Sequence, residues 1–299
     1  MTFEMTLEMG EIEFNYWDDH PKTAEFGAFK WRLSKTQQCD DAAIGCICFT
    51  LSCEPENKSQ TLLWSCASKG SIEAEGCTDP EDWEHKFDEK NSDKHLCVDA
   101  DEEREWTLSI EILKPILIDL SDPKNSLIKD ESDSVKVKVD EEDLWLSKKV
   151  LSSKSQFFDA FFNRDFKEKA TNTYELDGVK IDEFIDFLGH VHKVGFSVGK
   201  HNVAFLMKLA DKFQCKSIMD KCEEHLRTDG ELDASHQYYL EEKIGLADKF
   251  KKHHVLARLI DQLDMEDMKT LFWRVLVECG WELSETAKRM VQLKKATLV

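Results

Sequence analysis

The alternation of residues 135–139 constrains this chain more than any other feature. Val135, Val137 and Val139 alternate with Lys136 and Lys138. Apolar side chains at every second position are typical of a strand with one buried face. This pattern predicts a half-buried β-strand near the middle of the chain.

A phenylalanine-rich helix is predicted shortly after this strand. Ser147 and Ser155 stand where helix N-caps are expected, because a serine hydroxyl can accept from the free amides of a first helical turn. The second helix carries four aromatic rings, at Phe157, Phe158, Phe161 and Phe162. Four such rings exceed one narrow helix face, so we expect this helix to lie in a core or to be shared with a partner. Phe158 and Phe161 are expected in the core and Phe157 closer to the surface.

The order of these elements resembles the BTB/POZ domain across roughly residues 134–227. The resemblance rests on the strand, a turn, the Ser147-Lys148-x-x-Leu151 element, the Ser155-x-x-Phe158 helix, the triplet Phe166-Lys167-Glu168, and the next predicted strand, 173–176. Ser147 stands where most members of this family have histidine. The resemblance implies a small sheet with helices, a fold that binds other proteins.

Length and charge limit the functions open to the chain. Its 299 residues suit about two domains. A net charge of −20 repels phosphate backbones and anionic lipid surfaces, so neither nucleic acid nor a membrane is an expected partner. No apolar run approaches the roughly 20 residues of a membrane helix. The acidic N-terminus lacks a signal peptide, so the ten cysteines are expected as reduced thiols in the cytoplasm or nucleus.

Residues 1–118 read as an antiparallel β-sandwich. Alternating apolar positions occur from Ile12, from Phe29 and from Trp106, and residues 43–51 and 62–67 are apolar enough for central strands. The order of these segments resembles a divergent MATH domain, and such a domain precedes a BTB domain in known proteins. Residues 119–133 are acidic and polar, as in a linker. The predicted fold class is therefore α+β, in two domains.

Helical periodicity dominates the C-terminal part. Residues 209–213, Leu-Ala-Asp-Lys-Phe, recur as residues 246–250, and the apolar positions that follow align without a gap. The repeated unit is a helical hairpin, so the helices of residues 228–299 are expected to stack on those of the BTB region. They resemble the start of a BACK or 3-box extension.

The sharpest candidate site is the triplet that begins at Phe166. In BTB adaptors an apolar-x-Glu triplet at this place contacts the cullin scaffold of a ubiquitin ligase, so the resemblance implies that Phe166 and Glu168, with Phe157, bind a cullin. The alternative is that Phe166 folds onto its own domain and Glu168 is simply solvated.

Catalytic and metal sites are not expected. The Cys46-x-Cys48 pair falls on a predicted strand, unlike a zinc knuckle, and the other cysteines lack paired C-x-x-C spacing. The sequence has no Gly-x-Ser-x-Gly, His-Glu-x-x-His or glycine-rich phosphate loop. We therefore expect no enzyme activity, no metal and no cofactor.

Two hypotheses follow. The first is an adaptor that holds a cullin through its BTB domain and an unidentified protein target through its N-terminal domain. The second is a BTB-mediated homodimer or larger scaffold with no cullin role.

Overall fold

The computed structural model describes most of the chain: residues 8–15, 20–36, 46–74, 81–99, 105–163, 173–194, 196–228, 236–264, 268, 271, 275 and 282–298. The chain divides into two compact units. The first contains residues 1–149 and 165–196, and the second contains residues 150–164 and 197–299.

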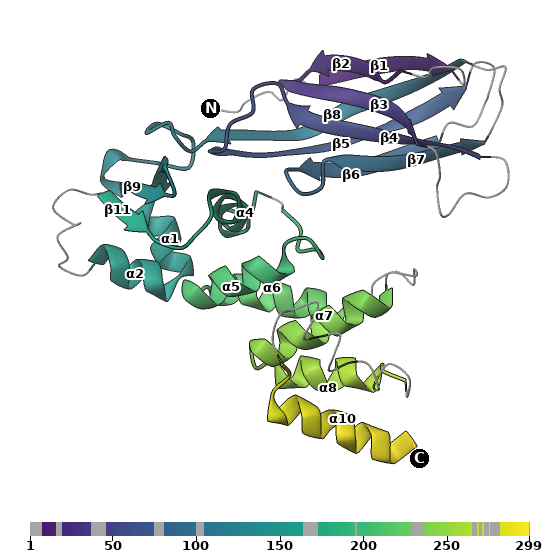
Figure 1. The fold of residues 1–299 in the computed structure, drawn as a ribbon. Coiled ribbons are helices and arrows are strands. Elements are labelled where there is room, and N and C mark those ends of the chain that lie inside the picture. Colours follow the sequence, from purple (N-terminus) through teal and green to yellow (C-terminus); the bar gives the residue numbers. More distant parts are fainter. Residues whose placement is uncertain are drawn as a thin grey trace. The chain divides into compact units, whose positions relative to one another are not determined.

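Two four-stranded antiparallel sheets build the N-terminal part of the first unit (Figure 1). One has the order β1-β8-β5-β6, with β1 Glu8–Asn15, β8 Glu105–Asp119, β5 Leu62–Ala74 and β6 Glu81–Asp88. The other has the order β2-β3-β4-β7, with β2 Lys22–Phe26, β3 Phe29–Thr36, β4 Cys46–Pro55 and β7 Asp93–Asp99. The predicted antiparallel β-sandwich is confirmed.

The core of the sandwich comes from the inward face of each strand. Trp31 on β3 and Leu108 on β8 are completely buried, and both belong to the alternating patterns seen in the sequence. Trp31 packs against Phe87 of β6 with ring centroids 5.4 Å apart in an edge-to-face arrangement. Aromatic residues from both sheets therefore close the sandwich.

A separate three-stranded sheet follows, in the order β10-β9-β11. It consists of β9 Ser134–Val139, β10 Glu142–Ser147 and β11 Thr173–Leu176. The hairpin partner β10 is antiparallel to β9 and β11 is parallel to it. Val135, Val137 and Val139 are completely buried, as their alternation with lysine predicts.

The acidic segment before β9 is bonded to this sheet. Leu120 is completely buried and its carbonyl accepts from the Trp145 amide at 2.7 Å. The Asn125 side chain donates to the Trp145 carbonyl at 2.9 Å. A short 3₁₀ turn, Glu131–Asp133, then leads into β9. Leu120 and Asn125, both within the predicted linker, are therefore hydrogen-bonded to β10.

Helix α4, Ile181–Val191, packs against β5 of the sandwich. After the helix ends, the Val194 carbonyl accepts from the buried Ser65 hydroxyl of β5 at 2.8 Å. Gly189 permits the close approach of Phe196, since a Cβ at Gly189 would lie 2.3 Å from that ring. The sandwich and α4 thus share a packed boundary inside the first unit.

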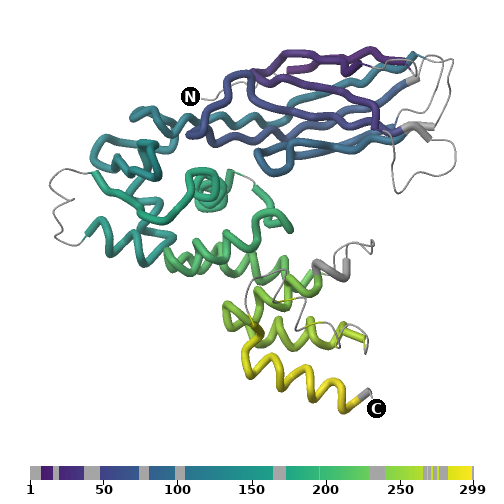
Figure 2. Tube along the Cα trace, in the orientation of Figure 1, coloured from purple at the N-terminus to yellow at the C-terminus, as the bar shows by residue number. Residues whose placement is uncertain are grey.

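The second unit is helical (Figure 2). Its elements are α1 Lys148–Lys154, which begins just before the unit, α2 Gln156–Asn163, α5 Val203–Lys212, α6 Lys216–Arg227, α7 His236–Lys249, α8 His253–Asp261 and α10 Glu285–Leu298. Helix α5 packs on α6, α7 packs on α8, and α10 packs on α8.

The sequence repeat is also a repeat of structure. At the end of α5 the amides of Phe213, Gln214 and Cys215 donate to the carbonyls of residues 209, 211 and 210. At the end of α7 the amides of Phe250, Lys251 and Lys252 donate to the carbonyls of residues 246, 248 and 247, the same pattern 37 residues later. Gln214 and Lys251 both have positive φ, 51° and 56°, as the residue after a helix has in a Schellman turn.

Candidate partner-binding site

Helix α2 is held at its first turn by Ser155. The Ser155 hydroxyl accepts from the Phe158 amide at 3.1 Å, which is the predicted N-cap. The same hydroxyl donates to the carbonyl of Phe213, just after α5. Because Ser155 is buried, this serine fixes the start of α2 and ties it to α5.

The four phenylalanines of α2 divide between the core and the surface. Phe158 and Phe162 are buried, and the Phe158 ring lies 4.8 Å from that of Phe213. Phe157 and Phe161 are half-buried and stack on each other with ring centroids 5.1 Å apart and an interplanar angle of 26°. Phe161 was expected in the core, but it shares the partly exposed face with Phe157.

This stacked pair presents an aromatic surface with polar neighbours. Gln156, Asp159 and Asn163 on the same helix are exposed, and the Asn163 amide donates to the Asp159 carboxylate at 2.7 Å. Half-buried aromatic rings bordered by polar groups are typical of the centre of a protein interface. Phe166 and Glu168, the other predicted contacts, lie outside the described residues.

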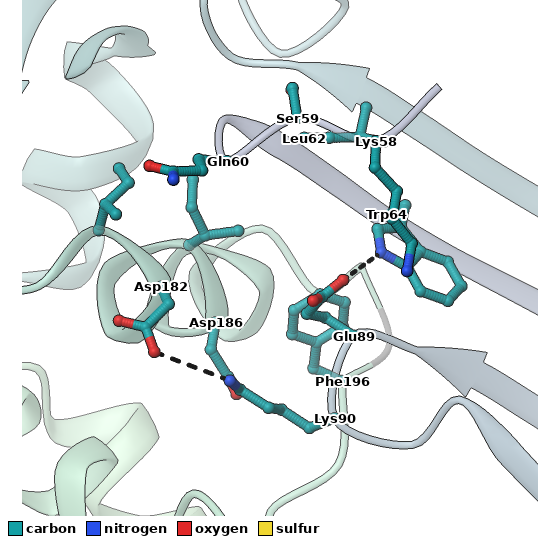
Figure 3. A pocket seen from close by; sticks show the side chains of 12 residues that line it. Lys58, Ser59, Gln60, Leu62, Trp64, Glu89, Lys90, Asp182, Asp186 and Phe196 are labelled. Atoms are coloured by element: carbon teal, nitrogen blue, oxygen red, sulfur yellow. Dashed lines mark hydrogen bonds and ion pairs between the residues drawn. The ribbon is translucent and has the colours of Figure 1, made fainter. Parts of the chain in front are cut away.

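The first unit contains a concave site of about 520 Å³ between β5, the β6–β7 turn and α4 (Figure 3). Its apolar floor is formed by Leu62 and Trp64 on β5, Ile181 and Ile185 on α4, and Phe196. Polar and charged residues form the rim, namely Lys58, Ser59, Gln60, Glu89, Lys90 and Asp182, and the buried Asp186 lines the pocket behind them. This volume is within the range of sites that hold a small ligand or a single large side chain.

Two interactions order the rim of this pocket. The Trp64 indole nitrogen donates to a Glu89 carboxylate oxygen at 2.9 Å. The Lys90 ammonium lies 3.9 Å from the Asp182 carboxylate (Figure 3). Lys58, the other cation of the rim, pairs with Glu54 at 2.5 Å. The carboxylates of Glu89 and Asp182 remain exposed at the mouth of the pocket.

A buried polar group lies behind the rim. Asp186 and His190, one turn apart on α4, are each about 3% exposed, and the His190 Nε2 atom lies 3.3 Å from the Asp186 carboxylate. Asp88, at the end of β6, is also buried, and burial raises its pKa, with Asp186 raising it further. These three groups lie buried where α4 packs against the sandwich.

Cys46 and Cys48 lie on β4, as predicted, two residues apart. Within the described residues, no group of three or more metal-binding side chains is gathered in one place. The same part of the chain has no helix that is both long and apolar enough to cross a membrane.

The central part of the chain matches a known family model. Residues 127–230 match the BTB/POZ domain. This segment is a BTB domain. The BTB domain therefore includes the β10-β9-β11 sheet, α2 with its aromatic pair, and the helices up to α6. The predicted range of 134–227 lies within the matched residues.

Similarity to curated proteins extends beyond the BTB domain. The chain is 25% identical over 280 residues to BTB and MATH domain-containing protein 36 of Caenorhabditis elegans, an alignment that covers 84% of this chain and 83% of that protein. It is 30% identical over 88 residues to BTB and MATH domain-containing protein 38 of the same organism, covering 29% of this chain and 23% of that protein. It is 32% identical over 77 residues to human Kelch-like protein 23, covering 26% and 14%. The alignment to the first of these proteins spans most of both chains, so the similarity reaches beyond the BTB domain into the β-sandwich.

Sequence reasoning missed the pocket entirely. Leu62 and Trp64 lie more than 110 residues before Ile181 and Ile185, and each pair looks like an ordinary core pattern of its own element. Only the packing of α4 on β5 brings them together. The half-buried Ile181 in the first turn of α4 is a local signal that could have indicated a shared surface.

Proposed function

We propose that this protein is an adaptor for a cullin-type ubiquitin ligase. In this proposal the BTB domain binds the cullin scaffold and the N-terminal sandwich binds the protein target. The single observation that carries the proposal is the partly exposed Phe157–Phe161 stack on α2 of a BTB domain. In this proposal the protein acts in the cytoplasm or nucleus, where the thiol–disulfide balance favours thiols.

The cullin interface is proposed to combine Phe157, Phe166 and Glu168. Aromatic side chains that are partly exposed can fill a pocket on a partner and supply most of the binding free energy. A nearby carboxylate selects a partner with complementary charge and speeds association. Phe157 is already held by contacts with Phe213 and Phe161, so little conformational entropy is lost when it is bound.

The adaptor itself carries out no bond chemistry in this proposal. It holds a target near the ubiquitin-charged enzyme and so raises the effective concentration of a target lysine. The rate of ubiquitin transfer then depends on simultaneous binding of both partners.

The proposed cullin interface is tested with purified full-length protein and the N-terminal domain of a cullin. Isothermal titration calorimetry compares the wild type with Phe157→Ala and with the Phe166→Ala, Glu168→Lys double variant. Each is expected to weaken binding about tenfold or more. Phe250→Ala is the matched control, because Phe250 is half-buried but lies after α7. Equal affinity in all four proteins would remove α2 and the triplet from the interface.

The pocket of the first unit is proposed to receive a basic side chain of the target. Leu62 and Ile181 are half-buried and can contact the aliphatic stem of arginine or lysine. The exposed carboxylates of Glu89 and Asp182 can then pair with its cation. Three carboxylates against two ammonium groups line the pocket, and the whole chain has a net charge of −20, so a basic segment complements it.

The indole N–H signal of Trp64 in a ¹⁵N correlation spectrum reports on this pocket, because that group donates to Glu89. N-acetyl-arginine amide is expected to shift this signal, and N-acetyl-citrulline amide, which has a similar shape without the charge, is expected to shift it far less. Asp182→Asn should weaken the arginine response while leaving the Trp64–Glu89 bond in place. Equal responses to the two amides, or none, would contradict a basic target at this site.

The alternative function is a homo-oligomeric scaffold made through the BTB domain. Multi-angle light scattering separates the two ideas. A stable dimer without affinity for any cullin N-terminal domain supports the scaffold.

A further inference from the structure

Two cysteines of the second sandwich sheet lie opposite each other on neighbouring strands. β4 and β7 are antiparallel, and Cys48 lies directly opposite Cys97. Their sulfur atoms are 2.9 Å apart. Sequence spacing does not reveal this pair, because only the register of β4 and β7 brings two cysteines 49 residues apart together.

The type of this cross-strand position follows from one hydrogen bond. The Cys53 amide donates to the Ser92 carbonyl at 2.9 Å, so Cys53 and Ser92 form a hydrogen-bonded pair. Hydrogen-bonded and non-hydrogen-bonded pairs alternate along an antiparallel ladder. In the same register, the Cys48–Cys97 pair is five residue pairs along the strands from the Cys53–Ser92 pair. Because five is an odd number, Cys48 and Cys97 form a non-hydrogen-bonded pair. At such a pair the Cα atoms are about 4.5 Å apart, which is within the range that a disulfide spans.

The pair is also reachable from solvent. Phe49, Leu51 and Cys53 of β4 face the sandwich core, so Cys48 points to the outer face. Cys48 is 5% exposed, whereas Cys97 is half-buried and lies on β7, the edge strand of its sheet. A small oxidant can therefore reach Cys97 first.

We propose that Cys48 and Cys97 are a redox modification site that closes reversibly into a disulfide across β4 and β7. The co-reactant is a low-molecular-weight disulfide of the glutathione class. The thiolate of Cys97 attacks one sulfur of that disulfide, and one glutathione thiolate leaves. The thiolate of Cys48 then attacks the Cys97 sulfur and displaces the second glutathione. Two electrons and two protons pass from the protein thiols to the two glutathione molecules.

Closure ties the edge strand to its neighbour by a covalent bond. The oxidised protein is expected to unfold at a higher temperature, by roughly 5 °C, because the bond closes a long loop of the unfolded chain. Reduction by excess glutathione restores the thiols. The β-sandwich therefore has a state that depends on the thiol–disulfide balance of its surroundings.

A second cysteine pair in the sandwich serves as an internal control. Cys53 and Cys66 are both completely buried in the core between the two sheets. Burial and the neighbouring Cys66 thiol raise the pKa of Cys53, which keeps it as an unreactive thiol. The proposal thus predicts which cysteines react and which do not.

The test uses the full-length protein equilibrated in glutathione buffers from fully reduced to fully oxidised. Free thiols are then alkylated, and the chain is digested with trypsin for mass spectrometry. The tryptic peptide of residues 95–104 holds Cys97 as its one cysteine, whereas the peptide of residues 36–58 holds four. Oxidation is expected to join these two peptides, with fragment ions that place the bond at Cys48.

Cysteine substitutions test the Cys48–Cys97 crosslink independently of the peptide mapping. Cys48→Ser is expected to abolish the crosslink and to leave Cys97 as a glutathione adduct, and Cys97→Ser is expected to abolish the crosslink as well. Cys222→Ser, in α6 of the second unit, should leave it unchanged. If Cys48 and Cys97 both stay alkylated in oxidised glutathione, or if Cys97 pairs with another cysteine, the proposal is overturned.

Discussion

The hydrogen bonds of Asp133 allow the effect of its substitution on the free energy of unfolding to be calculated. One oxygen of this buried carboxylate accepts from the Ser147 hydroxyl at 2.6 Å, and the other accepts from the Lys149 amide at 2.8 Å. The carboxylate therefore fixes both the end of β10 and the first turn of α1, where a negative charge also suits the helix dipole.

The cost of removing this group follows from the two bonds. A hydrogen bond to a charged acceptor contributes about 1.5–3 kcal/mol, so Asp133→Ala is expected to lower the free energy of unfolding by about 3 kcal/mol. Ser147→Ala removes one of the two bonds and is expected to cost about 1.5 kcal/mol. The double variant should cost much less than the two losses added together, with a coupling of about 1–2 kcal/mol, because both changes remove the same bond.

Urea unfolding followed by far-UV circular dichroism measures these differences as changes in midpoint at constant slope. The matched control is Asp143→Ala on β10, whose exposed carboxylate pairs with Lys136 at 2.7 Å and is expected to contribute about 0.5 kcal/mol or less. Additive losses from Asp133→Ala and Ser147→Ala, or a loss from Asp133→Ala no larger than that of the control, would refute the reasoning.

Three further predictions follow from single sites. Gln214→Gly and Lys251→Gly are each expected to raise stability by roughly 0.5–1 kcal/mol, because both residues have positive φ; a lower thermal midpoint in either would contradict this. Burial lowers the pKa of His192 from 6.5 to about 4. Between these values the unfolded chain binds a proton that the folded chain does not, so stability falls as the pH drops from 6.5 to 4, by at most about 3 kcal/mol. Thermal midpoints of His192→Gln should show a smaller decline over this range, and an identical decline would exclude His192 as its source. Glu223 is 9% exposed, and its carboxylate lies 2.5 Å from the Lys252 ammonium. Glu223→Gln is therefore expected to lower the free energy of unfolding in urea by about 2 kcal/mol, and Lys252→Ala on its own by about as much. An unchanged stability of Glu223→Gln would show that the pair contributes nothing.

Much of the fold was predictable wherever one side of an element faces a core. The alternation around Phe29 and Trp106 predicted β3 and β8, and Val135 to Val139 predicted β9. Ser155 was predicted as a helix cap and is one. The repeat of residues 209–213 at 246–250 predicted a repeated helical hairpin, and the hydrogen bonds that end α5 and α7 follow the same pattern.

The sequence has no pattern that predicts the remaining elements. β2, β6 and β7 are rich in charged residues, and all three lie at sheet edges, where exposed faces permit almost any polar side chain. The segment before β9 has the composition of a linker, but Asn125 and Leu120 bond it to β10. The pocket and the Cys48–Cys97 pair both depend on register and packing between segments far apart in the chain.

The role of α2 as a binding surface was inferred from its four phenylalanines, and the structure divides them into two buried and two half-buried rings. Periodicity alone does not distinguish Phe157 from Phe161, since both lie four residues apart on one face. Which of them a partner contacts depends on the neighbours from α5, and these are known only once the helices are packed.

The most direct test of the central proposal is light scattering during gel filtration of the full-length protein mixed with cullin N-terminal domains. We predict that one cullin co-elutes with the protein, in a complex whose mass corresponds to equal numbers of the two chains. A protein that elutes alone with every cullin, at the mass of a homodimer, would contradict the adaptor account.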